Sequence, residues 1–201
     1  LGVLRILLEA KIELNLKSLT DFSLNLHLKE VDRNSGSDIY NFMMDRLKAY
    51  YRDAGIDINI YEAVLAVSPD SPLDFHHRVE ALNEFTKSSD SKSLIESNKR
   101  IANILKDSNA EKEKLNPKML LEESEKTLFN ATESLSKDLS GSKNYKEAMK
   151  SLINLKDLID LFFDNVMVNA EDEEVKNSRL ALIRRVRQLF LSVADISHLS
   201  S

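Results

Sequence analysis

The 201-residue sequence contains no cysteine, so neither disulfide bonds nor thiolate metal sites can contribute to its fold or chemistry. It has only four glycines and three prolines, which leaves few interruptions and favours helices over sheets. No apolar run approaches the roughly 20 residues that cross a bilayer, and the first residues lack the pattern of a secretory signal peptide. These absences favour a helical protein, and the lack of cysteine fits a reducing compartment. We expect the protein to be cytoplasmic.

The composition is that of a globular protein. Apolar residues make up 42% of the chain and charged residues 30%, which excludes a disordered segment. The formal net charge of −5 argues against a general binder of polyanions, so a nucleic-acid surface would have to be a local basic face. The sequence begins in an apolar run without methionine, and we interpret it as part of a longer protein.

We predict that a long helix over residues 165–199 is the element around which the rest of the chain packs. Apolar residues recur in it at steps of three and four, the period of a helix stripe: Leu180, Ile183, Val186, Phe190 and Val193. Acids crowd its start, where they suit the helix dipole, and arginines occupy its middle. We expect the stripe to pack against a regular amphipathic helix over residues 144–164.

Further helices are predicted from start and stop signals. Ser71 followed by proline, and Asn116 followed by proline, are hydroxyl or amide caps that begin helices to about residues 86 and 139. Asp38 can cap a helix to about residue 54, which Gly55 ends, and another helix spans about 92–106. No strand pattern of period two persists, so we predict an all-α helical bundle.

The N-terminal third contains two predicted helices with apolar inner sides. In the helix over residues 16–31 the side chains expected to face inward are Leu19, Phe22, Leu26 and Leu24. In the helix that follows, they are Ile39, Phe42, Met43, Leu47 and Tyr50. The turn cluster at residues 33–37 separates the two helices and is our predicted domain boundary.

We find no catalytic constellation. There is no glycine-rich phosphate loop, and adjacent His76 and His77 diverge by roughly 100° on a helix, so they cannot share a metal ion. We expect these histidines to be exposed and structurally neutral. The acids at residues 171–174 could bind a divalent cation, but a solvated first turn that complements the helix dipole explains them better.

Two basic stretches, 98–103 and 179–187, have two interpretations. One is a solvated helix face with ion pairs between neighbouring turns. The other is RNA contact, in which arginine and lysine bind phosphates, asparagine or arginine reads base edges, and an aromatic ring stacks on a base. The residues themselves do not decide between these alternatives.

Several motifs resemble the β subunit of bacterial heterotetrameric glycyl-tRNA synthetases, whose C-terminal part is a DALR-type anticodon-binding domain. The matching segments in the first half are FMMDRL at 42–47 with Tyr50, AVLA at 63–66, and PLDF at 72–75 with Arg78 and Val79. Those in the second half are NKRI at 98–101, NIL at 103–105, FFDNVMV at 162–168, NSRL at 177–180, and the ending from Leu189 to Ser197. They occur in the family's order over about residues 38–199.

The resemblance implies two parts. Residues 1–36, beginning LGVLRI, are similar to the end of a helical, HD-like domain, and residues 37–201 to the DALR-type anticodon-binding helical domain. Despite its recognisable character, we expect the FFDNVMV motif to be structural, with Phe162, Val166 and Val168 fixing the angle into the last helix.

The resemblance also implies a function. The complete enzyme is a ligase that uses ATP to attach glycine to its tRNA, and the β subunit chiefly binds tRNA within an α₂β₂ heterotetramer with the α subunit. This chain would then bind the anticodon without a catalytic centre, metal or cofactor of its own. The alternatives are a non-catalytic assembly module that packs on other subunits or domains, and a catalytic role, which no residue cluster supports.

We predict RNA contacts from residues that combine donors for phosphates and base edges with one stacking ring. They are Arg46, Tyr50, Arg78, Asn98, Lys99, Arg100, Asn103, Arg179, Arg184 and Arg187. Tyr50 also fits the core stripe. Arg100 and Arg179 could instead hold helices together through buried carboxylates.

Overall fold

The computed structural model describes residues 1–26, 32, 35–109 and 114–200. Every regular element in these residues is helical, which confirms the predicted all-α fold. The α-helices are α1 (Gly2–Glu9), α2 (Leu16–Asn25), α3 (Ser35–Asp53), α4 (Ile58–Leu65), α5 (Pro72–Phe85), α6 (Ser91–Lys106), α7 (Glu123–Leu139), α8 (Tyr145–Ile153), α9 (Lys156–Asn165) and α10 (Glu173–Leu191). Two 3₁₀ turns, η1 (Pro117–Met119) and η2 (Ile196–His198), complete the set.

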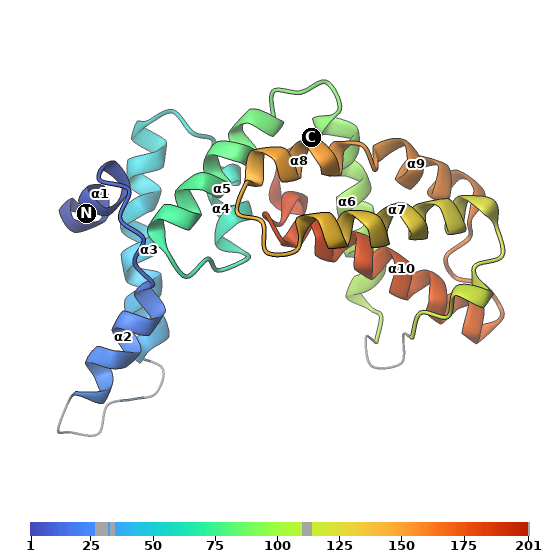
Figure 1. Cartoon of the computed structure of the whole chain (residues 1–201), viewed down its shortest axis with the longest axis horizontal. Coiled ribbons are helices and arrows are strands. Elements are labelled where there is room, and N and C mark those ends of the chain that lie inside the picture. Colours follow the sequence, from blue (N-terminus) through green and yellow to red (C-terminus); the bar gives the residue numbers. More distant parts are fainter. Residues whose placement is uncertain (27–31, 33–34, 110–113, 201) are drawn as a thin grey trace.

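The helices form an elongated arrangement with two ends (Figure 1). Helices α1 to α3 lie at one end, and α7, α9 and the start of α10 lie at the other, with α4, α5, α6 and α8 between them. Helix α1 packs on α5 and α2 packs on α3, while α8 packs on α5. No helix within the described residues is long and apolar enough to cross a membrane.

The predicted helix starts at Ser71 and Asn144 are confirmed by their cap hydrogen bonds. The predicted start of the last helix at residue 165 is wrong, because α10 begins at Glu173 after a cap at Asp172. Ser71 Oγ accepts from the Asp74 N–H at 3.4 Å, and the Asn144 side chain accepts from the Glu147 N–H at 3.3 Å. Asp172 accepts from the N–H groups of residues 174 and 175. Each bond satisfies a donor that the first turn of a helix leaves without a partner.

Glycines end two of the predicted segments. Gly55 has φ +77° directly after α3, and Gly141 has φ +74° in the turn between α7 and α8. Both are left-handed conformations that glycine adopts without steric cost.

The predicted stripe of α10 is confirmed, because its five residues are almost completely buried. The predicted packing of this stripe on a single helix over residues 144–164 is wrong. Residues 144–164 form two helices, α8 and α9, which pack mainly on α5 and α7, while α10 packs mainly on α6 and α7. The chain turns at Asn154 and Leu155, and buried Leu152, Leu155 and Ile159 serve both sides of that turn.

Two predicted inner faces near the N-terminus are also wrong. Leu19, Phe22 and Leu26 of the α2 segment are exposed, as are Ile39 and Phe42 of α3. The buried residues of α3 are Tyr40, Met44, Leu47 and Tyr51.

Hydrogen bonds explain which side of α3 is buried. The helix carries apolar residues on two sides, and the tyrosine side finds polar partners. The Tyr40 hydroxyl donates to the Pro69 carbonyl at 2.7 Å, and the Tyr61 hydroxyl donates to the Met44 carbonyl at 2.8 Å. Burial of a phenol is favourable when its hydroxyl has such a partner.

Some predicted boundaries also shift. Helix α3 begins at Ser35 and not at Asp38, and the segment after Asn116 forms η1 before α7 begins at Glu123. Arg33 and Asn34 of the predicted boundary cluster lie outside the described residues. The division near residue 37 stays a prediction.

The FFDNVMV segment is structural, as expected. Phe162, Val166 and Val168 are buried where α9 ends and the chain turns toward α10, whereas Met167 is exposed.

Candidate nucleic-acid interface

The ten predicted RNA-contact residues differ in what surrounds their side chains. Five are engaged by the protein itself: Arg78, Asn98, Arg179, Arg184 and Arg187. The other five lie at least partly at the surface: Arg46, Tyr50, Lys99, Arg100 and Asn103. The engaged group limits which donors remain for RNA.

Arg179 joins α10 to α7 in the interior. Its Nε donates to Glu125 Oε1 at 2.6 Å, and its Nη1 donates to the Met167 carbonyl at 2.9 Å. Glu125 has no exposed surface, and its other oxygen accepts from the Glu122 N–H at 2.7 Å in a capping box. Two buried charges are tolerated here because each is paired and hydrogen-bonded.

Arg78 fastens α5 to the end of α10 and to α8. Its guanidinium donates to Asp74 at 2.8 Å, to the carbonyls of Ser192 and Val193 at 2.7 Å each, and to the Tyr145 hydroxyl at 2.8 Å. The guanidinium also lies over the Tyr145 ring, with its central carbon 4.2 Å from the ring centroid.

Tyr145 completes this network. Its hydroxyl donates to Asp74 at 2.6 Å, and burial, followed by that hydrogen bond, raises the pKa of Tyr145 to about 12. Asp74 and Tyr145 were not among the predicted site residues. The spacing of four residues between Asp74 and Arg78 is a sequence signal that could have identified their ion pair.

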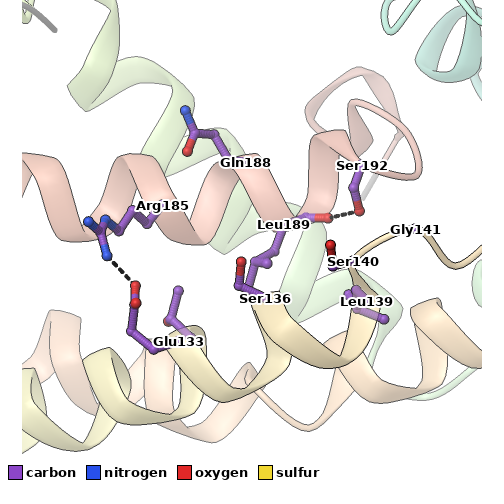
Figure 2. Close-up of a pocket in the computed structure, with 10 residues that line it drawn as sticks. Glu133, Ser136, Leu139, Ser140, Gly141, Arg185, Gln188, Leu189 and Ser192 are labelled. Atoms are coloured by element: carbon purple, nitrogen blue, oxygen red, sulfur yellow. Dashed lines mark hydrogen bonds and ion pairs between the residues drawn. The ribbon is translucent and has the colours of Figure 1, made fainter.

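The other arginines of α10 also have protein partners. Arg184 donates to Ser108 at 2.6 Å, and Arg187 pairs with Asp195 at 2.6 Å. Arg185, on the outer side, pairs with Glu133 of α7 across a groove of about 580 Å³ (Figure 2). The arginine face of α10 therefore serves largely to hold neighbouring segments.

Asn98 is not at the surface, although its sequence neighbours are. Its side chain is 1% exposed and donates to the Leu94 carbonyl one turn earlier, at 3.2 Å. Its amide is thus turned into the bundle.

The outer side of α6 carries the basic residues with unused donors. The Arg100 guanidinium lies over the Phe163 ring of α9, with its central carbon 4.1 Å from the ring centroid. Within the described part of the chain, neither Arg100 nor Lys99 has a carboxylate partner, and Asn103 is exposed one turn further on. Stacking on an aromatic ring fixes the guanidinium plane while leaving its N–H groups available.

Arg46 and Tyr50 lie on α3, at the other end of the molecule from α9 (Figure 1). Arg46 lies over the exposed Phe42 ring at 4.5 Å, and half-buried Tyr50 meets Tyr51 edge to face at 5.2 Å. The fold does not bring these two residues together with Lys99, Arg100 and Asn103.

A polar cleft of about 380 Å³ lies beside the end of α6 and the start of α10. It was missed from the sequence because its walls come from three separate segments. The lining residues are Asn103, Ile104, Asp107, Ser108, Asn109, Asn169, Glu173, Lys176, Asn177 and Leu180. Its side chains are chiefly amides and carboxylates, the groups that form hydrogen bonds with base edges.

The two histidines differ. His77 is exposed, as expected, but His76 is half-buried, so that expectation is wrong for His76. His76 stacks on Tyr51 and lies 3.2 Å from its hydroxyl, and burial lowers the pKa of its ring, with Glu80 opposing the shift. It belongs to the α3–α5 contact and not to a surface site.

Comparison with known proteins places these helices in a family. The sequence profile of the DALR anticodon binding domain matches residues 94–196, from α6 to η2. Curated relatives include the glycine–tRNA ligase beta subunits of Hahella chejuensis, 38% identical over all of this chain, and of Aliivibrio fischeri strain MJ11, 39% identical over 98% of it. That of Vibrio cholerae strain O395 is 40% identical over 98% of the chain. The chain spans only 29–30% of the length of these relatives.

Proposed function

The chain belongs to the DALR anticodon binding domain family, and we propose that it binds the anticodon region of a tRNA. The observation that carries the proposal is the outer side of α6, where Lys99 and Arg100 offer cationic donors without carboxylate partners in the described residues. Such donors bind phosphates, and they position an RNA before its bases are read.

The contact surface we propose is smaller than the sequence suggested. It consists of Lys99, Arg100 and Asn103, with Phe163 as the support of Arg100. Arg78 and Arg179 contribute to it only indirectly, because their guanidinium groups are occupied by protein acceptors. Arg46 and Tyr50 lie on α3 and are not part of this surface.

We further propose that the tRNA is that for glycine. The support is the similarity, over nearly the whole chain, to proteins named glycine–tRNA ligase beta subunit. In this proposal the chain acts in the cytoplasm as the tRNA-binding part of an α₂β₂ ligase with a separate α subunit. ATP is then used by the complete enzyme and not by this chain.

Binding of a glycine tRNA transcript to the chain tests this function. We expect binding that weakens when the two cytosines shared by glycine anticodons are replaced. Alanine at Lys99, Arg100 and Asn103 together should weaken binding, whereas alanine at Lys126, an exposed lysine on α7, should not. Equal affinity for glycine and altered anticodons would contradict anticodon recognition.

A second function, assembly, is favoured by one specific observation. Large apolar side chains are exposed on the three N-terminal helices, where a partner surface could cover them: Val3, Ile6, Leu19, Phe22, Leu26, Ile39 and Phe42. The two functions are compatible, because these residues lie at the opposite end of the molecule from α9 (Figure 1).

A further inference from the structure

The cleft between the end of α6 and the start of α10 differs from the basic surface beside it. Its ionisable side chains are Asp107, Glu173 and Lys176, so its formal charge is negative. Glu173 forms an ion pair with Lys176, with 3.6 Å between Oε1 and Nζ. Asp107 has no ion pair among the described residues. This charge disfavours a phosphate and favours a neutral group with N–H donors.

The other walls of the cleft suit a flat, polar ring. The amides of Asn103, Asn169 and Asn177 make no hydrogen bond within the described part of the molecule, so their donors and acceptors remain available. Ile104 and Leu180 add apolar surface against which a ring face can lie. The volume of about 380 Å³ falls within the range of small-ligand pockets.

Asn103 connects the cleft to the proposed RNA surface. It lines the cleft, and it lies one turn along α6 from Lys99 and Arg100. An RNA strand whose phosphate meets Arg100 could therefore place a neighbouring, unpaired base at the cleft. Unpaired loop bases are the ones that proteins splay out and read by their edges.

We propose that this cleft reads one unpaired base that carries an exocyclic amino group, with Asp107 as the residue that determines specificity. This inference rests on the proposed function. A carboxylate only accepts hydrogen bonds, so it pairs with the amino group of cytosine, and neighbouring amides donate to the cytosine ring nitrogen or carbonyl. Uracil presents a carbonyl oxygen where cytosine has its amino group, and the Asp107 carboxylate would repel it.

The test uses anticodon stem–loops of glycine tRNA in which each anticodon cytosine is replaced, one at a time, by uracil. The unaltered chain should bind one of these substituted loops about 5- to 150-fold more weakly, the range that corresponds to about 1–3 kcal/mol for a good base contact. With Asp107→Asn, the ratio of cytosine to uracil affinity at that position should fall to below about 3-fold, because an amide can donate to the uracil carbonyl.

Glu174→Gln is the matched control. Like Asp107→Asn, it removes one negative charge near the cleft, here from the first turn of α10. Glu174 does not line the cleft. It should therefore preserve the ratio of the unaltered chain, and circular dichroism should show that both variants keep their helices.

The outcomes separate the two proposals. If the unaltered chain binds the loops and discriminates cytosine from uracil, but Asp107→Asn discriminates equally well, the cleft is not the base-reading site. Anticodon binding then still stands. Binding without any discrimination between cytosine and uracil likewise contradicts base reading by the cleft. If the unaltered chain does not bind the loops, the proposed function fails and this inference fails with it.

Discussion

Arg179 of α10 and Arg100 of α6 have the same side chain in opposite surroundings. Arg179 is 8% exposed and paired with fully buried Glu125, whereas Arg100 is exposed and rests on the Phe163 ring without a carboxylate partner in the described residues. The first contact holds two helices together, and the second leaves donors available. The comparison teaches that the density of arginines in a sequence does not mark an RNA surface, because the available acceptors decide which arginines remain free.

The largest effect on stability is expected at the buried pair. Arg179→Ala leaves the Glu125 carboxylate buried without its cation, so the free energy of unfolding should fall by about 3–5 kcal/mol. Urea denaturation of the variant and of the unaltered chain measures this. A loss below about 1 kcal/mol would mean that the pair does not hold α7 and α10 together.

The double variant Arg179→Ala with Glu125→Ala sharpens this prediction. If the two side chains interact directly, the double variant should lose less stability than the sum of the two single losses. Additive losses would indicate that each residue acts through other neighbours.

A smaller effect is expected at Arg78. Arg78→Lys retains the charge but loses the planar fork that reaches two carbonyls and the Tyr145 hydroxyl together. The free energy of unfolding should fall by about 1.5–3 kcal/mol, the range for hydrogen bonds to charged groups. Arg185→Lys, in the more exposed pair with Glu133, is the matched control and should change stability by about 0.5 kcal/mol or less.

The smallest expected effect is the pH dependence due to His76. Its pKa is lowered from the ordinary value of 6.5 by burial, so the folded chain binds this proton less readily than the unfolded chain does. The stabilisation is complete above the unfolded pKa and is lost as the pH falls through the folded pKa. His76→Gln should therefore reduce the loss of stability between pH 7.5 and 5, whereas replacement of exposed His77 should leave it unchanged.

The sequence predicts those parts of the fold that depend on neighbouring residues. The helix starts at Ser71 and Asn144 and the stripe of α10 are local patterns, and the structure has them. The buried side of α3 could not be predicted, because the helix offers two apolar sides and the carbonyls of distant residues select one of them.

The candidate site was less predictable for the same reason. The partner of Arg179 is Glu125, which lies 54 residues earlier in the chain, so no local pattern shows that the guanidinium is occupied. The ring under Arg100 comes from another helix, and the amide-lined cleft combines Asn103, Asn169 and Asn177 from separate segments. Sequence identified the residue types but not which of them the fold uses internally.

The most direct test of the central claim is the salt dependence of tRNA binding by Arg100→Ala, with Lys126→Ala as the control. Arg100 contributes little to the fold, so its replacement should change stability by no more than about 1 kcal/mol, the value of an exposed cation–π contact. If Arg100 binds a phosphate, its loss should weaken binding and reduce the slope of log affinity against log salt by about one, while the control keeps both. An unchanged affinity and slope for Arg100→Ala would contradict the claim that the outer side of α6 is the RNA-binding surface.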